Sequence, residues 1–348
     1  MKNFTLLALV CQSFCLTAQV SGGQQTFQFM MLPASARLAA LGGMQVAVRD
    51  DDVAFATANP AALNSSMSGR LTFQHSFFLA DLQNGYAGGA WQLQRLPFVV
   101  HGGVQYMKYG EIKRADQYGD ITGTVQAGET ALTAGAARPL GERLQIGLNL
   151  RLAFSTLDAQ KASAIASDLG FMYADTARRL TVGLVLRNAG TQMKTYYDRR
   201  ENIPFDIQLG FSKKLAHLPF RFGVVAHHLH QWDIRYNDPN GVTKDITSLD
   251  GQDEEESKFS AATDNFFRHF IFNGEFLLGK NEGFRLLFAY NHLRKRELSV
   301  SGYRSLAGFS GGIGLKINRF RIDAGYASYH LGGSILHVGI GTNLKDFF

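Results

Sequence analysis

Alternation of apolar and polar residues with a period of two is the feature that most constrains how this chain can fold. In residues 143–154 every even position holds a large apolar side chain. The odd positions of the same stretch are polar or small: Arg143, Gln145, Gly147, Asn149, Arg151 and Ala153. Residues 205–211 and 320–330 repeat the pattern. Because successive side chains of a strand point to opposite faces, these stretches are predicted to be strands with one apolar face.

The same pattern, followed along the whole chain, predicts an all-β fold of fourteen strands. They begin near residues 69, 83, 97, 129, 143, 162, 179, 205, 219, 266, 283, 306, 320 and 334. The alternation is weakest in the strands near 83, 129 and 162. A composition with 18% charged residues, 37 Gly and 27 Phe suits a β-rich chain better than a helical one.

The lengths of the connections distinguish a soluble sandwich or barrel from a transmembrane barrel. The predicted connections are short at 96–97, 140–142, 177–179, 216–218, 280–282 and 318–319. Those on the other side include long ones at 109–128, 190–204, 233–265 and 294–305. An even strand count with short turns on one rim and long loops on the other is the plan of outer-membrane barrels. The terminal aromatic residue, Phe348, is typical of barrels handed to the outer-membrane assembly machinery. Residues 67–348 are therefore predicted to form a transmembrane antiparallel β-barrel.

The first residues have the layout of a secretory signal peptide, with cleavage after Ala18. The apolar run at 4–10 is much shorter than the roughly 20 residues that a membrane-spanning helix needs. Both cysteines, Cys11 and Cys15, lie in this segment. A lipoprotein acylated at Cys15 is the alternative, although the three preceding residues lack the small side chains that such processing requires. With residues 1–18 removed, no thiol remains for disulfides, thiolate zinc sites or nucleophiles. We expect export to the outer membrane of a Gram-negative bacterium.

Residues 19–66 are rich in Ala, Gly and Ser and do not alternate. A short helix is expected at 34–41, stopped by Gly42 and Gly43, and a second after 50–52, which Pro60 ends or restarts. Wide barrels are often plugged, and small residues allow a segment to fold within one. The sequence thus predicts an N-terminal plug, with a periplasmic extension as the alternative. The residues expected to hold the plug in its fold are Ser35, Arg37, Gly42, Gly43, Asp51, Asn59 and Pro60.

The stretches SARLAALGG, RDDD and ANPAAL, ahead of fourteen predicted strands, resemble the PorV/PorQ group of FadL-like outer-membrane barrels. The order TFQFMMLPASARLAALGG at 26–43 and the short barrel are more similar to the PorQ branch than to the PorV branch. This resemblance implies a fourteen-stranded barrel with an N-terminal hatch. It also implies a non-enzymatic component of the type IX secretion system, in a complex with PorU, PorV and PorZ that anchors secreted proteins to lipopolysaccharide.

A different function is compatible with the same fold. A FadL-type barrel can transport hydrophobic compounds, which requires an apolar pocket and a gap or kink in the wall. The inward face is predicted to be mostly Gly, Ala, Gln, Asn, Arg and Asp. This composition is a weak argument against an apolar path for hydrophobic compounds. A general porin is disfavoured by the plug. No cofactor is predicted, and the net charge of +6, or +5 without Lys2, gives no argument for nucleic acid.

Charged residues on the predicted outer loops are candidates for contacts with partners or lipid. The basic ones face lipopolysaccharide phosphates or serve solubility: Lys113, Arg114, Arg199, Arg200, Arg294, Lys295 and Arg296. The longest loop carries an acidic cluster that includes Asp253, Glu254 and Glu255. Such a cluster is usually a solvated loop, and the alternative is a contact surface for a partner. Its spacing lacks the EF-hand pattern of a calcium site.

Two groups of histidines are candidates for chemical sites. His228, His230 and Trp232 are expected on the lipid face of a strand as part of an aromatic belt, in preference to a metal site that also uses His227. A hydrolase triad could be drawn from the set His75, Ser76, Asp81, His101 and His269. Triads are recognised by geometry, and no GxSxG-type elbow is present, so no catalytic residue is predicted.

Overall fold

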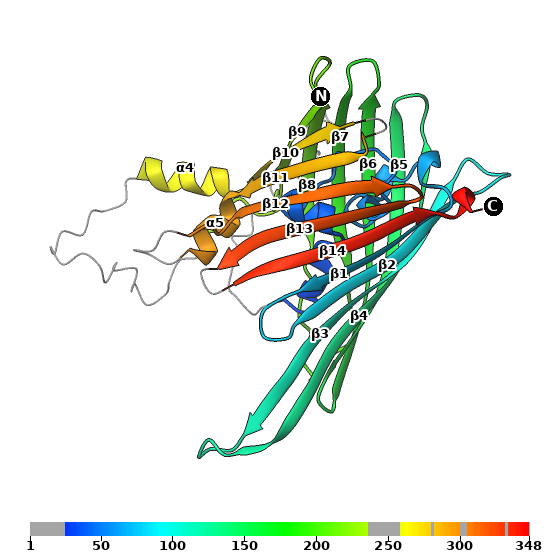
Figure 1. The fold of residues 1–348 in the computed structure, drawn as a ribbon. Coiled ribbons are helices and arrows are strands. Elements are labelled where there is room, and N and C mark those ends of the chain that lie inside the picture. The colour runs from blue at the N-terminus through cyan, green and yellow to red at the C-terminus, as the bar shows by residue number, and fades with distance from the viewer. Residues whose placement is uncertain (1–24, 236–257, 280–281, 300–304, 331–332, 348) are drawn as a thin grey trace, which may run out of the picture.

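The alternating segments form a closed antiparallel β-barrel, which confirms the predicted fold class (Figure 1). The computed structural model describes residues 25–235, 258–279, 282–299, 305–330 and 333–347. The fourteen strands are β1 (Arg70–Phe77), β2 (Gln83–Gln92), β3 (Val99–Ala115), β4 (Ile121–Pro139), β5 (Leu144–Leu157), β6 (Gln160–Asp175), β7 (Leu180–Lys194), β8 (Asp206–Lys214), β9 (Phe220–Ala226), β10 (Phe270–Leu278), β11 (Phe284–Asn291), β12 (Phe309–Ile317), β13 (Phe320–His330) and β14 (Gly333–Asn343). Each strand pairs with its neighbours in the sequence, and β1 pairs with β14 to close the ring, with Phe73 opposite Ile340.

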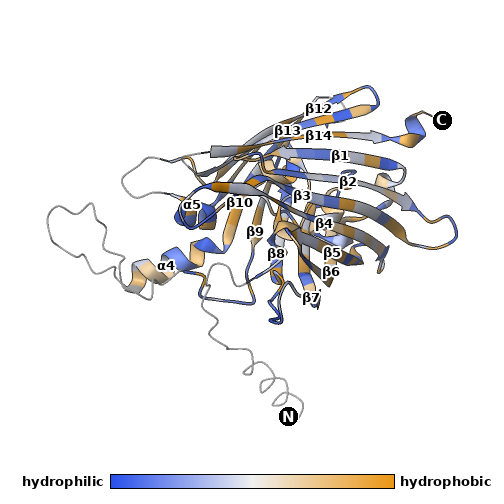
Figure 2. Cartoon of the chain, turned by 90° about the horizontal axis from the view of Figure 1, so that it is seen from below, coloured by the Kyte–Doolittle hydropathy of each residue, from blue (hydrophilic) through white to orange (hydrophobic). Residues whose placement is uncertain are grey.

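The outward face of the barrel is apolar and the inward face polar or small. In β5 the exposed residues include Leu148, Leu150 and Leu152, whereas Asn149 and Arg151 between them are buried. The same alternation of orange and blue runs along the strands in Figure 2. A soluble barrel would bury the apolar face, so this inverted arrangement is that of a barrel spanning a bilayer.

Short connections gather on one rim and longer ones on the other. The rim with residues 93–98, 140–143, 176–179, 215–219 and 318–319 is called the short-turn rim. The opposite rim, which carries 195–205 and the described parts of the connections between β9 and β10 and between β11 and β12, is called the long-loop rim. The tight connections at 78–82, 116–120 and 158–159 also lie on the long-loop rim. The predicted division of the connections is thus confirmed, apart from individual loop lengths.

Three of the predicted long loops are more regular than expected. The loop expected at 109–128 is limited to 116–120, because β3 and β4 continue as a hairpin. A bulge near Gly110 interrupts the pairing, and beyond it Lys113 pairs with Thr124. The strand expected from 266 begins at Phe270 and is preceded by helix α4 (Lys258–Arg268). Helix α5 (His292–Leu298) occupies much of the loop expected at 294–305. Weak local alternation hid the extended β3–β4 hairpin, and a period of two gives no signal for the two helices.

Residues 25–69, here called the N-terminal segment, precede the barrel as short helical turns. These are η1 (Gln28–Met31), α2 (Ala36–Ala40), α3 (Phe55–Ala58), η2 (Pro60–Ala62) and η3 (Ser65–Met67). Helix α2 contacts β1 and β11 to β14, while η2 contacts β4 to β6 on the other side of the ring. In Figure 1 the segment, in blue, lies between these two groups of strands. The segment therefore lies within the ring, on the polar inward face of the strands.

The described helices are short. None of those in the described part of the chain is both long and apolar enough to cross a membrane. The longest of them is α4, with 11 residues. The predicted signal peptide at 1–18, the acidic residues Asp253, Glu254 and Glu255, and the terminal Phe348 lie outside the described residues.

Candidate functional site

Buried ion pairs join the N-terminal segment to the barrel wall. Arg37, on α2, donates to Glu275 on β10 at 2.8 Å and to Asp50 at 2.7 Å. Arg221, on β9, contacts the same two carboxylates at 3.0 and 3.3 Å. The Arg37 guanidinium also lies 4.8 Å from the centre of the Phe55 ring. These contacts hold two turns of the N-terminal segment and two strands in one arrangement.

The pairing continues toward the short-turn rim through the predicted residue Asp51. Its carboxylate lies 2.5 Å from Arg70 at the start of β1 and 3.6 Å from Arg285 on β11. The inner ion network is defined as Arg37, Asp50, Asp51, Asp52, Arg70, Arg221, Glu275 and Arg285. The prediction singled out Arg37 and Asp51 but missed their wall partners, which occupy ordinary inward positions of alternating strands.

The other predicted residues of the segment shape its backbone. Ser35 caps α2 by accepting a hydrogen bond from the Leu38 N–H at 3.2 Å. Asn59 accepts from the Ala61 N–H at 3.0 Å and donates to the Val46 carbonyl at 2.8 Å, and Pro60 opens η2. Gly42 and Gly43, in the sequence after α2, have φ of 93° and 94°, a conformation that glycine adopts without strain. A Cβ at Gly42 would also overlap Ile271 of β10.

A second buried polar cluster lies on β5 to β7. Arg151 pairs with Asp168 at 2.8 Å, and Asn149 donates to the same carboxylate at 3.1 Å. Arg151 also donates to the Thr57 carbonyl at 2.5 Å, and Arg187 donates to the Met30 carbonyl at 3.1 Å. Buried cations of the wall thus satisfy carbonyl groups of the N-terminal segment, as buried polar groups require.

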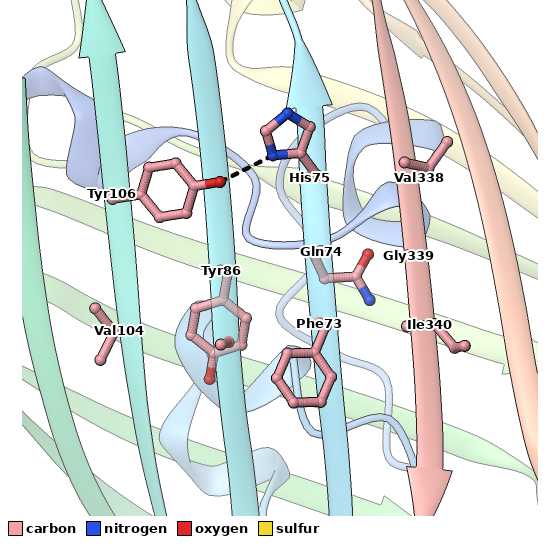
Figure 3. Close-up of a pocket in the computed structure, with 10 residues that line it drawn as sticks. Phe73, Gln74, His75, Tyr86, Val104, Tyr106, Val338, Gly339 and Ile340 are labelled. Atoms are coloured by element: carbon pink, nitrogen blue, oxygen red, sulfur yellow. Dashed lines mark hydrogen bonds between the residues drawn. The ribbon is translucent and has the colours of Figure 1, made fainter.

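An apolar groove, here called the wall groove, lies where β14, β1, β2 and β3 meet (Figure 3). Its volume is about 530 Å³, and its lining residues are Phe73, Gln74, His75, Tyr86, Ala87, Val104, Tyr106, Val338, Gly339 and Ile340. Phe73, Val104 and Ile340 are 53%, 40% and 41% exposed on the outward face. The small outward residue Ala87, which pairs with both Phe73 and Val104, leaves the space between them.

Inward-facing residues form the floor of the wall groove. Gln74 accepts a hydrogen bond from the Ala36 N–H of the N-terminal segment at 3.1 Å. Tyr86 is 2% exposed, and its hydroxyl has no hydrogen-bond partner among the described residues. The one polar pair on the outward side is His75 with Tyr106, whose Nδ1 and hydroxyl lie 2.9 Å apart (Figure 3). The groove suits a small apolar molecule or chain and lies one residue layer from the N-terminal segment.

The predicted basic contacts divide into exposed and engaged residues. Lys113 and Arg114 lie on the extended part of β3, where Arg114 pairs with Asp158, and Arg199 and Arg200 are exposed on the β7–β8 connection. The three on α5 contact other residues. Arg294 stacks at 4.0 Å over Tyr329, Lys295 donates to the Ser305 carbonyl at 2.6 Å, and Arg296 pairs with Asp264 at 2.5 Å. These last three have a structural role that the loop prediction missed.

The expected position of the histidine cluster is wrong. Strand β9 ends at Ala226, so His228 and His230 do not continue its lipid face. His228 takes φ of 55°, and its N–H donates to Asp206 at 2.7 Å. His227 is buried and its Nδ1 lies 2.5 Å from that of His228. In the described part of the chain, no group of three or more His, Cys, Asp or Glu is arranged to hold a metal ion.

The residues from which a hydrolase triad could be drawn are not assembled. His75 faces outward, His101 bonds to Asn149 inside the barrel at 2.7 Å, and His269 lies beside Trp232 at the long-loop rim. Ser76 instead contacts His337 at 2.6 Å, a buried pair that the sequence did not suggest. The Nε2 atom of His337 has no partner among the described residues, so the carboxylate of a triad is not in place there.

Solved structures similar to this chain are outer-membrane barrels. The CymD monoaromatic hydrocarbon channel aligns with a TM-score of 0.55 at 11% identity, over 90% of this chain and 98% of CymD. The TodX monoaromatic hydrocarbon channel, as a deltaS2 mutant, gives 0.51 at 10% identity over 89% and 98% of the two chains. A Pseudomonas aeruginosa FadL homologue gives 0.51 at 9% identity over 90% and 99%. The fold is FadL-like.

Comparison of the sequence alone with family models and curated proteins gives no match. The structural likeness supports the predicted FadL-like fold. Because only about a tenth of the residues are identical, the likeness is evidence for the fold and not for a shared function. The solved neighbours are channels and a FadL homologue, not enzymes.

Proposed function

We propose that this protein is an outer-membrane barrel that passes small apolar compounds between the membrane and its lumen. The wall groove carries this proposal, because it combines an apolar lining open to the lipid side with a floor that touches the N-terminal segment through Gln74 and Ala36. A volume of about 530 Å³ is within the range of ligand pockets, roughly 300–1,000 Å³. Two solved neighbours are described as monoaromatic hydrocarbon channels, which supports the same class of compound.

In this proposal the N-terminal segment acts as the plug. Its polar anchors, Arg37 and Asn59, are 1% and 0% exposed, so the interior offers no wide aqueous path beside them. Apolar compounds would enter through the wall at this groove, where the outward residue between Phe73 and Val104 is the small Ala87. The segment would then shift locally at Ala36 to let the compound pass, while the inner ion network holds the rest in place.

Blocking the wall groove tests this function. We expect Ala87→Trp to fill the groove and to reduce uptake of a labelled monoaromatic hydrocarbon about tenfold, which corresponds to about 1.4 kcal/mol. Leu150→Trp is the matched control, because Leu150 is 53% exposed on the outward face of β5, away from the groove. Both variants must reach the same abundance in the outer membrane. Equal uptake by wild type and Ala87→Trp would rule out the groove as the entry.

A second candidate is the secretion platform that the resemblance implies. It is supported by the motif block at 26–63 and by the buried ion pairs that fix the segment in the lumen. In this candidate the barrel is a non-enzymatic anchor for PorZ, PorU or PorV. Lys113, Arg114, Arg199 and Arg200 would contact lipopolysaccharide phosphates.

Deleting the gene separates the two candidates. Proteomics of periplasm, cell surface and medium would show periplasmic build-up, or loss of the surface anchor, of secreted proteins if the barrel is a platform. An unchanged secretome with reduced uptake of apolar compounds would support the transporter. An Ala87→Trp strain should reproduce only the uptake defect.

A further inference from the structure

Helix α4 is attached to the long-loop rim by its polar face. Asp264 pairs with Arg268 at 2.8 Å within the helix, and with His292 at 3.1 Å and Arg296 at 2.5 Å on α5. Asn265 donates to the Trp232 carbonyl at 2.8 Å and accepts from the Ile234 N–H at 3.1 Å. These contacts fix the rotation of α4 about its own axis, so the direction of its other face is also fixed.

The opposite face of α4 is aromatic and uncovered. Phe259 and Phe266 are 82% and 44% exposed on this face. Phe267, which is 42% exposed, contacts His292 of α5 instead, with 6.2 Å between ring centres. Phe259 and Phe266 are seven residues apart and therefore lie above one another on the same side of the helix. Trp232, itself 68% exposed, lies 6.4 Å from Phe266 between ring centres. An exposed patch of this kind marks an interaction surface.

Ring contacts join this patch to the apolar wall of the barrel. The Phe266 ring lies 4.9 Å from that of Phe270, the first residue of β10. The Phe270 ring stacks in turn on Phe272 at 6.3 Å, and Phe272 is 40% exposed on the outward face. The outward face of β10 continues through Phe276. In Figure 1 the helix, in yellow, extends sideways from the rim, away from the barrel.

We propose that α4 and Trp232 form a membrane-surface anchor, with the aromatic face of the helix inserted at the headgroup and acyl-chain boundary of the adjoining leaflet. The aromatic patch is continuous with the lipid-facing wall, so the bilayer that covers Phe272 meets Phe266 next. Amphipathic helices bind such boundaries by burying their apolar face about 5–10 Å deep, and Trp and Phe are favoured there. The occupant is thus a lipid surface. This anchor would fix the height and tilt of the barrel in the membrane.

Depth-dependent quenching of tryptophan fluorescence tests the anchor. The chain has only two tryptophans, so Trp91→Phe combined with Trp232→Phe gives a silent background. Phe259→Trp reports on α4, and Tyr118→Trp reports on the β3–β4 tip as a matched control, because both positions are 82% exposed. Each protein is reconstituted into vesicles of phosphatidylcholine brominated near the headgroup end of its acyl chains. Aqueous iodide is the competing quencher.

The anchor predicts opposite results at the two positions. The Phe259→Trp reporter should have blue-shifted emission and lose intensity in brominated vesicles, with little effect of iodide. The Tyr118→Trp reporter should respond to iodide and not to bromine. Iodide quenching of the Phe259→Trp reporter without bromine quenching would overturn the proposal. So would protection from both quenchers, which would mean that a second copy or another protein segment covers the face.

Discussion

Arg37 and Glu275 form a buried ion pair, 2.8 Å between Nε and Oε1, although 238 positions separate them in the chain. The pair links the N-terminal segment to the centre of β10, and both side chains are almost completely removed from solvent. Its partners, Asp50 and Arg221, complete a four-membered arrangement of alternating charge. This arrangement gives the segment a defined position relative to the strands.

Removing one member of this arrangement should destabilise the barrel strongly. Arg37→Ala leaves the carboxylates of Glu275 and Asp50 short of a partner, and breaking a buried pair in this way costs about 3–5 kcal/mol. The measurement is the denaturant midpoint in detergent, together with protease resistance of the segment. Arg178→Ala is the control, since that side chain is 79% exposed. An Arg37→Ala protein as stable as the control would show that the pair does not hold the segment.

Adding a side chain at Gly42 should lower the stability of the protein more than adding one at Gly119, although the two glycines have similar φ angles. The two φ angles are 93° and 90°, so Ala at either site carries the left-handed penalty of about 1–2 kcal/mol. At Gly42 the added Cβ also overlaps Ile271, whereas nothing lies within 4 Å of it at Gly119. Overpacking adds about 1–3 kcal/mol. Thermal unfolding of Gly42→Ala and Gly119→Ala compares them directly, and equal shifts would contradict the packing at β10.

The N-terminal segment should begin at the long-loop rim and end at the short-turn rim. Gln25 forms a bridge with Asn202, which lies in the β7–β8 connection, whereas Arg70 begins β1 at the other end. In intact cells a membrane-impermeant maleimide should label Gln25→Cys and not Arg178→Cys. Arg178 belongs to a short turn and is exposed, so it should react only after the outer membrane is permeabilised. The reverse pattern would invert the orientation.

The stability of the contact between α4 and α5, here called the α4–α5 junction, should depend on pH through Asp264. Burial alone would raise the pKa of this carboxyl, but hydrogen bonds from Arg268 and His292 and the charges of Arg268 and Arg296 hold it below its ordinary value of 3.8. A lowered pKa stabilises the folded junction at pH above that ordinary value, and the stabilisation is lost as the pH falls through the folded pKa. Asp264→Asn should remove this dependence. Fluorescence of Trp232 in the Trp91→Phe protein, followed between neutral and acidic pH, measures it.

The aromatic belt and the outer loops show where local patterns mislead. His228 and His230 continue the alternation of β9 in sequence, yet the strand ends at Ala226 because the chain turns at His228 and its N–H bonds to Asp206. Conversely, residues 109–128 hardly alternate, yet most of them are strand because β3 and β4 pair with each other. In both cases contacts with another part of the chain outweigh the local signal.

The sequence by itself determined the wall of this protein: the number and order of the strands, their apolar outward face and the uneven rims. These follow from a period of two, which is a property of the extended backbone and is visible in any short stretch. Only the tertiary structure decided that Arg37 meets Glu275, that Ala87 lies beneath a groove, and that α4 turns Phe259 outward. Each of these depends on which strands and turns become neighbours. That is set by register and by the path of the N-terminal segment, which local periodicity does not encode.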